Sequence, residues 1–228
     1  MRFIALSFLA VSLHAQMLVP IVAGTPATAS CTTPTGTTWY ESYGDTGTGA
    51  CFTGYTGCAH SWTLIQGSPT IAASPSGAPA NTACANGLQL APAATIAAVY
   101  ATITGITTVD LHFTVYWSGT PSGGTCFFSL KAGSTMEESL CFYFGTRLQI
   151  QTAAGGVNSS GTDTNANVAP NTWYDVLIHI DSVLANSYFS LNSGTHIGFT
   201  AVSATLTRFE WDGPGTGAET LSIGNMYY

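Results

Sequence analysis

The sequence predicts an all-β protein, built as an antiparallel sandwich or barrel. Several segments alternate apolar and polar side chains, which is the pattern of a half-buried strand. Turn residues recur about every 8–12 residues between these segments, as they do in all-β folds. The composition agrees, because 25 Gly, 10 Pro and abundant Thr among 228 residues disfavour helix interiors. A chain of this length is consistent with one domain.

The first half of the chain is expected to hold short, irregular strands. Residues 37–58 are rich in Gly and Thr with aromatic anchors, which indicates short strands and loops. Residues 61–73 look like a strand broken at residues 67–69, and residues 75–79 look like a surface loop. Residues 93–104 have the alanine content of a short helix, but their Val, Tyr, Thr and Ile favour a strand.

The clearest strand covers residues 110–117. Its apolar set is Leu111, Phe113, Val115 and Trp117, and its polar set is Asp110, His112, Thr114 and Tyr116. Strict alternation places the two sets on opposite faces of a sheet. Further strands are expected at residues 126–130, 140–144, 147–152, 173–181, 188–192, 196–200, 207–211 and 221–228, with a loop at 153–167.

The N-terminus has the features of an export signal. Arg2 supplies the positive charge, an apolar run covers residues 3–13, and Ala15 offers a cleavage point. We expect a signal peptide at residues 1–15, a flexible leader at residues 16–36 and one domain at residues 37–228. The alternative is a buried first helix. No later apolar run approaches the length of a transmembrane helix.

Six cysteines follow the predicted signal, and an even number in an exported chain indicates three disulfides. Proximity favours Cys51–Cys58. Cys126–Cys141 would join two adjacent strands, which leaves Cys31–Cys84. Sequence alone does not fix the pairing. A zinc site is an alternative that the irregular spacing disfavours, and lipid attachment at Cys31 is another.

The charge of the chain excludes one class of partner. Four basic residues stand against eleven acidic ones, which gives a net charge of −7. Nucleic acid is a poor partner for such a chain, because binding it depends on clustered Lys and Arg. Only 7% of the residues are charged and 46% are hydrophobic, so intrinsic disorder is also excluded.

The C-terminal half resembles a known superfamily. Residues 171–176 are Asn-Thr-Trp-Tyr-Asp-Val, residues 188–194 are Tyr-Phe-Ser-Leu-Asn-Ser-Gly, and residues 223–228 are Ile-Gly-Asn-Met-Tyr-Tyr. This order resembles the concanavalin-A-like lectin/glucanase superfamily, especially its laminin-G-like branch, over residues 100–228. The resemblance implies a jelly roll of two stacked antiparallel sheets. It also implies that the protein binds or cleaves carbohydrate or binds another protein.

A sugar site needs an aromatic surface beside hydrogen-bonding groups. The polar faces of the expected strands offer Asp110, His112, Tyr116, Arg147, Gln149, His179 and Asp181, with Glu210 and Trp211 as further candidates. If the middle strands form one concave sheet, the first seven would line a single groove. The alternative is that they are simply the exposed half of alternating strands.

Catalytic and metal sites are less well supported by the residues. Laminarinase-type relatives carry Glu-x-Asp-x-Glu on one strand, whereas Glu210-Trp211-Asp212 supplies only part of that pattern. Glu137 and Glu138 are adjacent and would face opposite sides of a strand.

Asp110, His112, His179 and Asp181 would converge on a metal ion only if their strands were neighbours. Calcium is conceivable at Asp163, Asn165 and Asn167, and no other cofactor is expected.

The sequence therefore predicts a secreted or cell-surface, non-catalytic recognition domain. Its expected partner is a glycan or another cell-surface ligand. Two alternatives stay open. One is a structural or adhesive protein that self-assembles, and the other is a diverged glycoside hydrolase or polysaccharide lyase.

Overall fold

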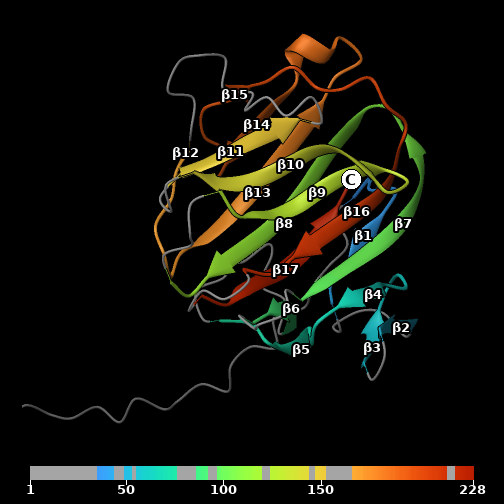
Figure 1. Cartoon of the computed structure of the whole chain (residues 1–228), viewed down its shortest axis with the longest axis vertical. Coiled ribbons are helices and arrows are strands. Elements are labelled where there is room, and N and C mark those ends of the chain that lie inside the picture. Colours follow the sequence, from blue (N-terminus) through green and yellow to red (C-terminus); the bar gives the residue numbers. More distant parts are fainter. Residues whose placement is uncertain are drawn as a thin grey trace, which may run out of the picture.

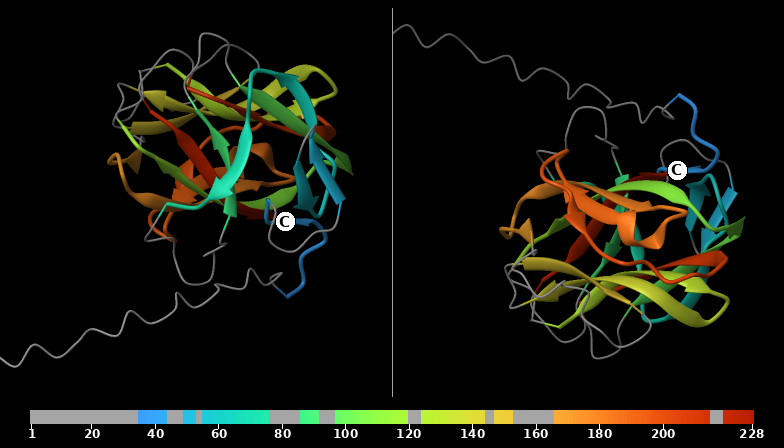
Figure 2. Two further views of the ribbon diagram at one scale, coloured as in Figure 1. Left: turned by 90° about the horizontal axis from the view of Figure 1, so that it is seen from below. Right: turned by 90° about the horizontal axis from the view of Figure 1, so that it is seen from above.

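The computed structural model describes residues 35–43, 49–52, 55–75, 86–91, 97–119, 124–143, 147–152, 166–214 and 219–228. They form a two-layer antiparallel sandwich (Figure 1). Seen from above in Figure 2, strands β13–β15 and strands β10–β12 lie in separate layers. The predicted all-β sandwich is therefore confirmed.

Sheet 1 has eight strands, with β8 and β17 near its centre. Its order is β15 (Ile197–Gly198), β14 (Tyr188–Leu191), β13 (Trp173–Ile180), β8 (Val109–Trp117), β17 (Leu221–Tyr227), β6 (Asn86–Leu90) and β5 (Thr70–Ala73), and β1 (Tyr40–Glu41) pairs with β17. All of these pairings are antiparallel.

Sheet 2 has seven strands. Its order is β12 (Ala166–Asn167), β11 (Arg147–Thr152), β10 (Thr135–Tyr143), β9 (Cys126–Ala132), β16 (Leu206–Asp212), β7 (Ala98–Ile106) and β4 (Thr63–Gln66). A separate hairpin joins β2 (Gly49–Phe52) to β3 (Tyr55–Cys58), and a short 3-10 helix, η1 (Leu184–Asn186), follows β13. Among the described residues, no helix is long and apolar enough to cross a membrane.

The alternation seen in the sequence creates the core. On β8, Leu111, Phe113 and Val115 are fully buried and face the other sheet, where Phe113 packs 4.9 Å from Phe128 and 5.0 Å from Trp211, measured between ring centres. Burial of apolar surface between two sheets is the main favourable term in such a fold. On the opposite, polar face of β8, Asp110 is exposed and His112 and Tyr116 are partly exposed.

Two of the three predicted disulfides are confirmed. Cys51 and Cys58 close the β2–β3 hairpin, and Cys126 and Cys141 link β9 to β10. The predicted Cys31–Cys84 bond lies outside the described residues, as do the signal peptide and nearly all of the leader.

The strand favoured for residues 93–104 is confirmed over the described part, and its helical alternative is wrong, because residues 98–106 form β7 between β16 and β4. The β-branched and aromatic residues there outweigh the alanines once the strand is paired on both sides. The strand expected at residues 196–200 shrinks to Ile197–Gly198, which pairs with β14 at the edge of sheet 1.

The N-terminal end of the domain is fastened beside the C-terminus. The backbone amides of Thr38 and Trp39 donate to the carbonyl of Tyr228, at 2.8 and 3.2 Å. The Trp39 ring stacks on the Tyr228 ring at 5.9 Å. These contacts hold Gly36 and Tyr228 at the end of sheet 1 where β8 begins and β13 ends.

Candidate ligand-binding groove

An open groove of about 520 Å³ lies at this end of sheet 1. We call it the His179 groove. Its lining includes Thr108, Asp110, His179, Asp181, Ser182 and Tyr228. β8 and β13 are adjacent and antiparallel, and their register places Asp110 directly opposite His179. The start of one strand and the end of the other thus bring the polar side chains together.

Hydrogen bonds fix the imidazole at the centre of the groove. The Nδ1 atom of His179 lies 2.6 Å from Oδ1 of Asp110, and its Nε2 atom lies 3.4 Å from Oδ2 of Asp181. The other oxygen of Asp181 accepts a bond of 2.6 Å from the backbone amide of Val183. The imidazole is therefore held between two carboxylates, and Asp181 also binds the backbone of the loop that follows β13.

The electrostatics of the groove follow from this arrangement. Burial lowers the pKa of His179, but the hydrogen bonds and negative charges of Asp110 and Asp181 outweigh it, so the pKa is raised above its usual value. The amide of Val183, followed by His179, lowers the pKa of Asp181. The side chain of Asp110 is 66% exposed, so much of its surface faces solvent.

Aromatic rings flank the triad formed by Asp110, His179 and Asp181, on the same face of sheet 1. Tyr188 of β14 stacks on His179 with ring centres 4.7 Å apart, and His196 stacks on Tyr188 at 3.8 Å. His112 stacks on Tyr227 at 4.8 Å. Such stacking fixes ring orientation and leaves polar edges accessible for hydrogen bonds. The face therefore combines rigid rings with carboxylate acceptors.

The predicted ligand residues do not share one groove. Asp110, His179 and Asp181 line the His179 groove, and His112 lies on the same face of sheet 1. Tyr116 also belongs to that face, but at the far end of β8, where its hydroxyl donates to Asn171 at 3.2 Å.

Arg147 and Gln149 belong to β11 of the other sheet, so their predicted place beside the histidines is wrong. Alternation indicates which side of a strand a residue occupies, but it does not indicate which sheet the strand joins. Gln149 is 3% exposed, and its side-chain oxygen has no hydrogen-bond partner among the described atoms.

Glu210 lies on the outward face of sheet 2 in a compact ion cluster. Its Oε1 atom is 2.5 Å from Nζ of Lys131, and its Oε2 atom bonds to the guanidinium of Arg208. Arg208 also covers the ring of Tyr100, 3.7 Å from the ring centre. Burial, with the nearby charge of Glu210, raises the pKa of Asp212 to about 6.

Trp211 is a core residue and cannot contact a ligand directly. It is fully buried, and its indole nitrogen donates to the hydroxyl of Tyr43 at 2.8 Å. Its place between Glu210 and Asp212 reflects strand alternation, with the two carboxylates outward and the ring inward.

Sequence analysis missed several groove residues. Tyr228, Thr108 and Ser182 line the groove but were not among the candidates. Tyr188 and His196, which stack beside His179, were not among them either. Tyr188 could have been found from its register, because it lies opposite His179 on the neighbouring strand. Thr108 and Ser182 sit in turns, which carry no periodic signal.

The described residues contain no group of three or more His, Cys, Asp or Glu side chains arranged to hold a metal ion. Of the predicted calcium ligands, only Asn167 lies in the described part of the chain. It belongs to β12, opposite Arg147. Asp163 and Asn165 lie outside the described residues.

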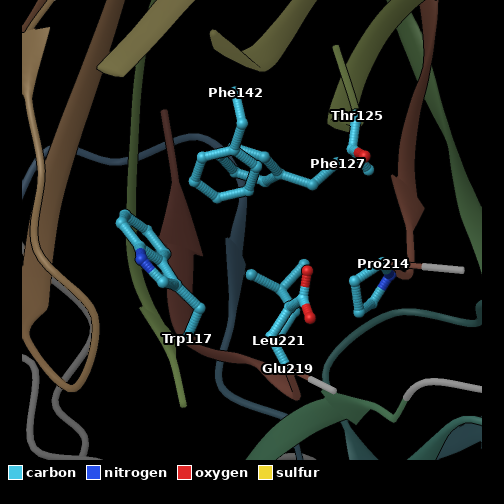
Figure 3. A pocket seen from close by; sticks show the side chains of 7 residues that line it. All are labelled: Trp117, Thr125, Phe127, Phe142, Pro214, Glu219 and Leu221. Atoms are coloured by element: carbon cyan, nitrogen blue, oxygen red, sulfur yellow. The ribbon is translucent and has the colours of Figure 1, made fainter. Parts of the chain in front are cut away.

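An interior cavity at the opposite end of the sandwich is too small for a ligand. Figure 3 shows Trp117, Phe127, Phe142 and Leu221 around it, with Pro214 and Glu219 at one side. Its volume of about 10 Å³ is at the lower limit for a single water molecule.

Comparison with known proteins supports the fold alone. No protein-family model and no curated protein sequence matches the chain. Among solved structures, a sialidase matches 73% of this chain with 14% identity and a TM-score of 0.53. The match covers 16% of the sialidase. A cellulose induced protein, Cip1, matches 70% of this chain and 85% of its own, with 9% identity and a TM-score of 0.50.

Proposed function

We propose that this protein is a secreted, non-catalytic recognition domain that binds an uncharged carbohydrate in the His179 groove. The observation that carries the proposal is the groove itself. It places an aromatic ring, two carboxylates and an imidazole around an open volume of about 520 Å³, which is within the usual range of ligand sites, roughly 300–1,000 Å³.

The groove has both surfaces that a sugar ring needs. Tyr228 offers an aromatic face, held in place by its stack on Trp39. Asp110, Asp181 and Ser182 offer hydrogen-bonding groups that can pair with sugar hydroxyls. Because His179 already fixes Asp110, binding would cost little reorganisation of that side chain.

The charge of the groove supports an uncharged ligand. Two carboxylates line it against one histidine, and all Lys and Arg side chains within the described residues lie on sheet 2. A sugar acid would therefore bring its carboxylate beside Asp110 and Asp181 without a permanent cation to receive it.

The Glu210 cluster supports a non-catalytic role. Both oxygens of Glu210 are bonded to cations, and its side chain is only 6% exposed. A carboxylate held in this way is poorly placed to attack or protonate a glycosidic bond. We regard the cluster as a structural element of sheet 2.

We also propose that the sandwich is a concanavalin-A-like jelly roll of the laminin-G-like kind. The central position of β17, the last strand, beside β8 and β6 supports this assignment. Secretion is supported by the two disulfides, which form and persist in oxidising compartments, and by the export-signal features of residues 1–15.

Glycan-array binding of the purified protein tests the proposal, with Asp110→Asn and His179→Ala as the decisive variants. We expect the wild type to bind neutral glycans and both variants to lose about tenfold or more in affinity, the loss that follows from one or two charge-assisted hydrogen bonds. Asp212→Asn makes the same chemical change on sheet 2 and should leave binding intact.

Two results would overturn the proposal. One is the absence of glycan binding by the wild type. The other is loss of binding in Asp212→Asn but not in Asp110→Asn, which would move the site to sheet 2. Concentration-dependent self-association without glycan would favour the adhesive alternative. Release of reducing sugar that Glu210→Gln abolishes would favour the hydrolase.

A further inference from the structure

We propose that a second hollow beside the His179 groove extends it, so that the protein binds a linear oligosaccharide chain rather than a single terminal sugar. This inference rests on the proposed function, because it concerns the same ligand. It adds a second binding subsite, with its own residues and its own chemistry.

The second hollow has a volume of about 320 Å³. It lies between the turn that joins β7 to β8, the loop after β13 and the segment that leads into β16, all at the upper end of the molecule in Figure 1. Thr108 and Ser182 line both this hollow and the His179 groove. The two spaces are therefore neighbours, with these two residues at their boundary.

The second hollow differs from the first in chemistry. Its lining includes the hydroxyl side chains of Thr107, Ser203 and Thr205 together with the apolar side chain of Leu184, and it has no charged lining residue. Hydroxyl groups both donate and accept, so they suit the hydroxyls of an uncharged sugar. The groove therefore offers one subsite with carboxylates and a second, uncharged subsite.

The walls of the second hollow are held in place by backbone hydrogen bonds. The amide of Ala201 donates to the carbonyl of Leu184 at 3.0 Å, and the amide of Phe199 donates to the carbonyl of Ser187 at 2.8 Å. These bonds tie the segment before β16 to the loop after β13. A preformed wall lowers the entropy cost of binding.

A carboxylate holds the same segment from sheet 2. Oε1 of Glu138 accepts a bond of 2.7 Å from the amide of Val202. Glu138 is buried and lies in β10, on the side of the segment away from the loop after β13. The segment is thus fixed on two sides.

The sizes of the two spaces favour a chain. Each is large enough by volume for a small ligand, since ligand sites usually span roughly 300–1,000 Å³. A linear oligosaccharide that passes over Thr108 and Ser182 would place one unit in each. A single sugar would leave one of the two hollows without contacts.

Isothermal titration calorimetry with neutral oligosaccharides tests this inference. The probes are linear β-linked glucose and mannose oligosaccharides of one to six units. We expect affinity for one of the series to rise about tenfold between one unit and three or four, as the second subsite fills, and then to level off.

Two blocking variants test where the gain arises. Ser203→Trp and Thr107→Trp each place a bulky ring at the second hollow, one from the segment before β16 and one from the turn after β7, and both positions are exposed, so folding should survive. We expect each variant to keep the affinity for one unit and to lose the gain with length. Thr63→Trp, on exposed β4 of sheet 2, is the matched control and should behave as the wild type.

The outcomes separate this inference from the proposed function. Failure of the wild type to bind any neutral glycan overturns both. Binding that is independent of chain length, or a length gain that survives in both blocking variants, overturns the second subsite and leaves the His179 groove as a site for a single sugar.

Discussion

At the scale of single residues, two carboxylates at the surface fix the imidazole of the His179 groove. Asp110 and Asp181 orient His179 from its two ring nitrogens, so the groove has one defined imidazole orientation. Because the pKa of His179 is raised above its unfolded value, the histidine stabilises the fold below that unfolded value and loses this contribution as pH rises through its folded pKa. The pKa of Asp181 is lowered, so its contribution is lost as pH falls through its own folded pKa, and the triad stabilises the fold most between these two transitions.

Glu41, unlike Asp110 and Asp181, is fully buried. Its Oε1 atom accepts from the amides of Ser42, Tyr43 and Ala59. Its Oε2 atom accepts from the amide of His60 and the indole of Trp62. One side chain thus satisfies five donors that have come together from two parts of the chain.

We predict that Glu41→Ala lowers the free energy of unfolding by about 3–5 kcal/mol, because it leaves several buried donors without an acceptor. Urea unfolding measures the change. Gln66→Ala, on exposed β4, is the control and should change stability by less than about 0.5 kcal/mol. A loss in Glu41→Ala no larger than in this control would contradict the assigned role.

At the scale of elements, the segment between β15 and β16 lines the second hollow and is bonded to β10 of sheet 2. Its attachment to β10 depends on Glu138, whose Oε2 atom is buried without a hydrogen-bond partner among the described atoms. Burial, opposed by the bond from Val202 and helped by the charge of neighbouring Glu137, raises the pKa of Glu138 to about 7.

We predict that Glu138 makes stability depend on pH. Its folded pKa is above the unfolded one, so the protonated form stabilises the fold at acid pH, and that stability is lost as pH rises from about 4.5 to about 7. Glu138→Gln should remove this loss and be more stable than the wild type above pH 7, by up to about 3 kcal/mol.

Thermal unfolding of both proteins between pH 4 and pH 8 measures the effect. The wild-type and Glu138→Gln melting temperatures should converge near pH 4 and diverge toward pH 8. Parallel curves over this range would show that Glu138 is ionised normally in the fold. Glu137→Gln, at the adjacent position of β10, is the matched control and should change the pH dependence much less.

At the scale of the whole molecule, the basic side chains within the described residues are confined to one of the two sheets. Within the described residues, every Lys and Arg lies on sheet 2, whereas the His179 groove on sheet 1 is lined by carboxylates. The whole chain carries a net charge of −7. Anionic ligands therefore meet an unfavourable potential when they approach the groove.

We predict that the protein discriminates against acidic sugars, because carboxylates line the His179 groove. A neutral oligosaccharide should bind at least about tenfold more tightly than its sialylated counterpart at low salt, and the difference should shrink as salt screens the charges. Paired titrations at two ionic strengths measure it. Equal affinities, or preference for the sialylated form, would show that the groove charges do not set specificity.

The sequence by itself determined the fold class and the polarity of individual strand faces. These are local properties, because alternation with period two assigns each side chain to one face of its own strand. Asp110 and His179 were therefore correctly expected on polar faces, and Phe113 and Trp117 in the core. Proximity in the sequence favoured the Cys51–Cys58 and Cys126–Cys141 bonds, and the pairing of β2 with β3 and of β9 with β10 brings these cysteines together.

Only the tertiary structure decided which strands share a sheet. Arg147 and His179 both lie on strands with alternating patterns, yet their strands belong to different sheets. Strand order depends on pairings between residues far apart in the chain, and no local pattern encodes those pairings. The same applies to the groove, since Tyr228, Thr108 and Ser182 meet there only because the start of β8, the end of β13 and the C-terminus lie together.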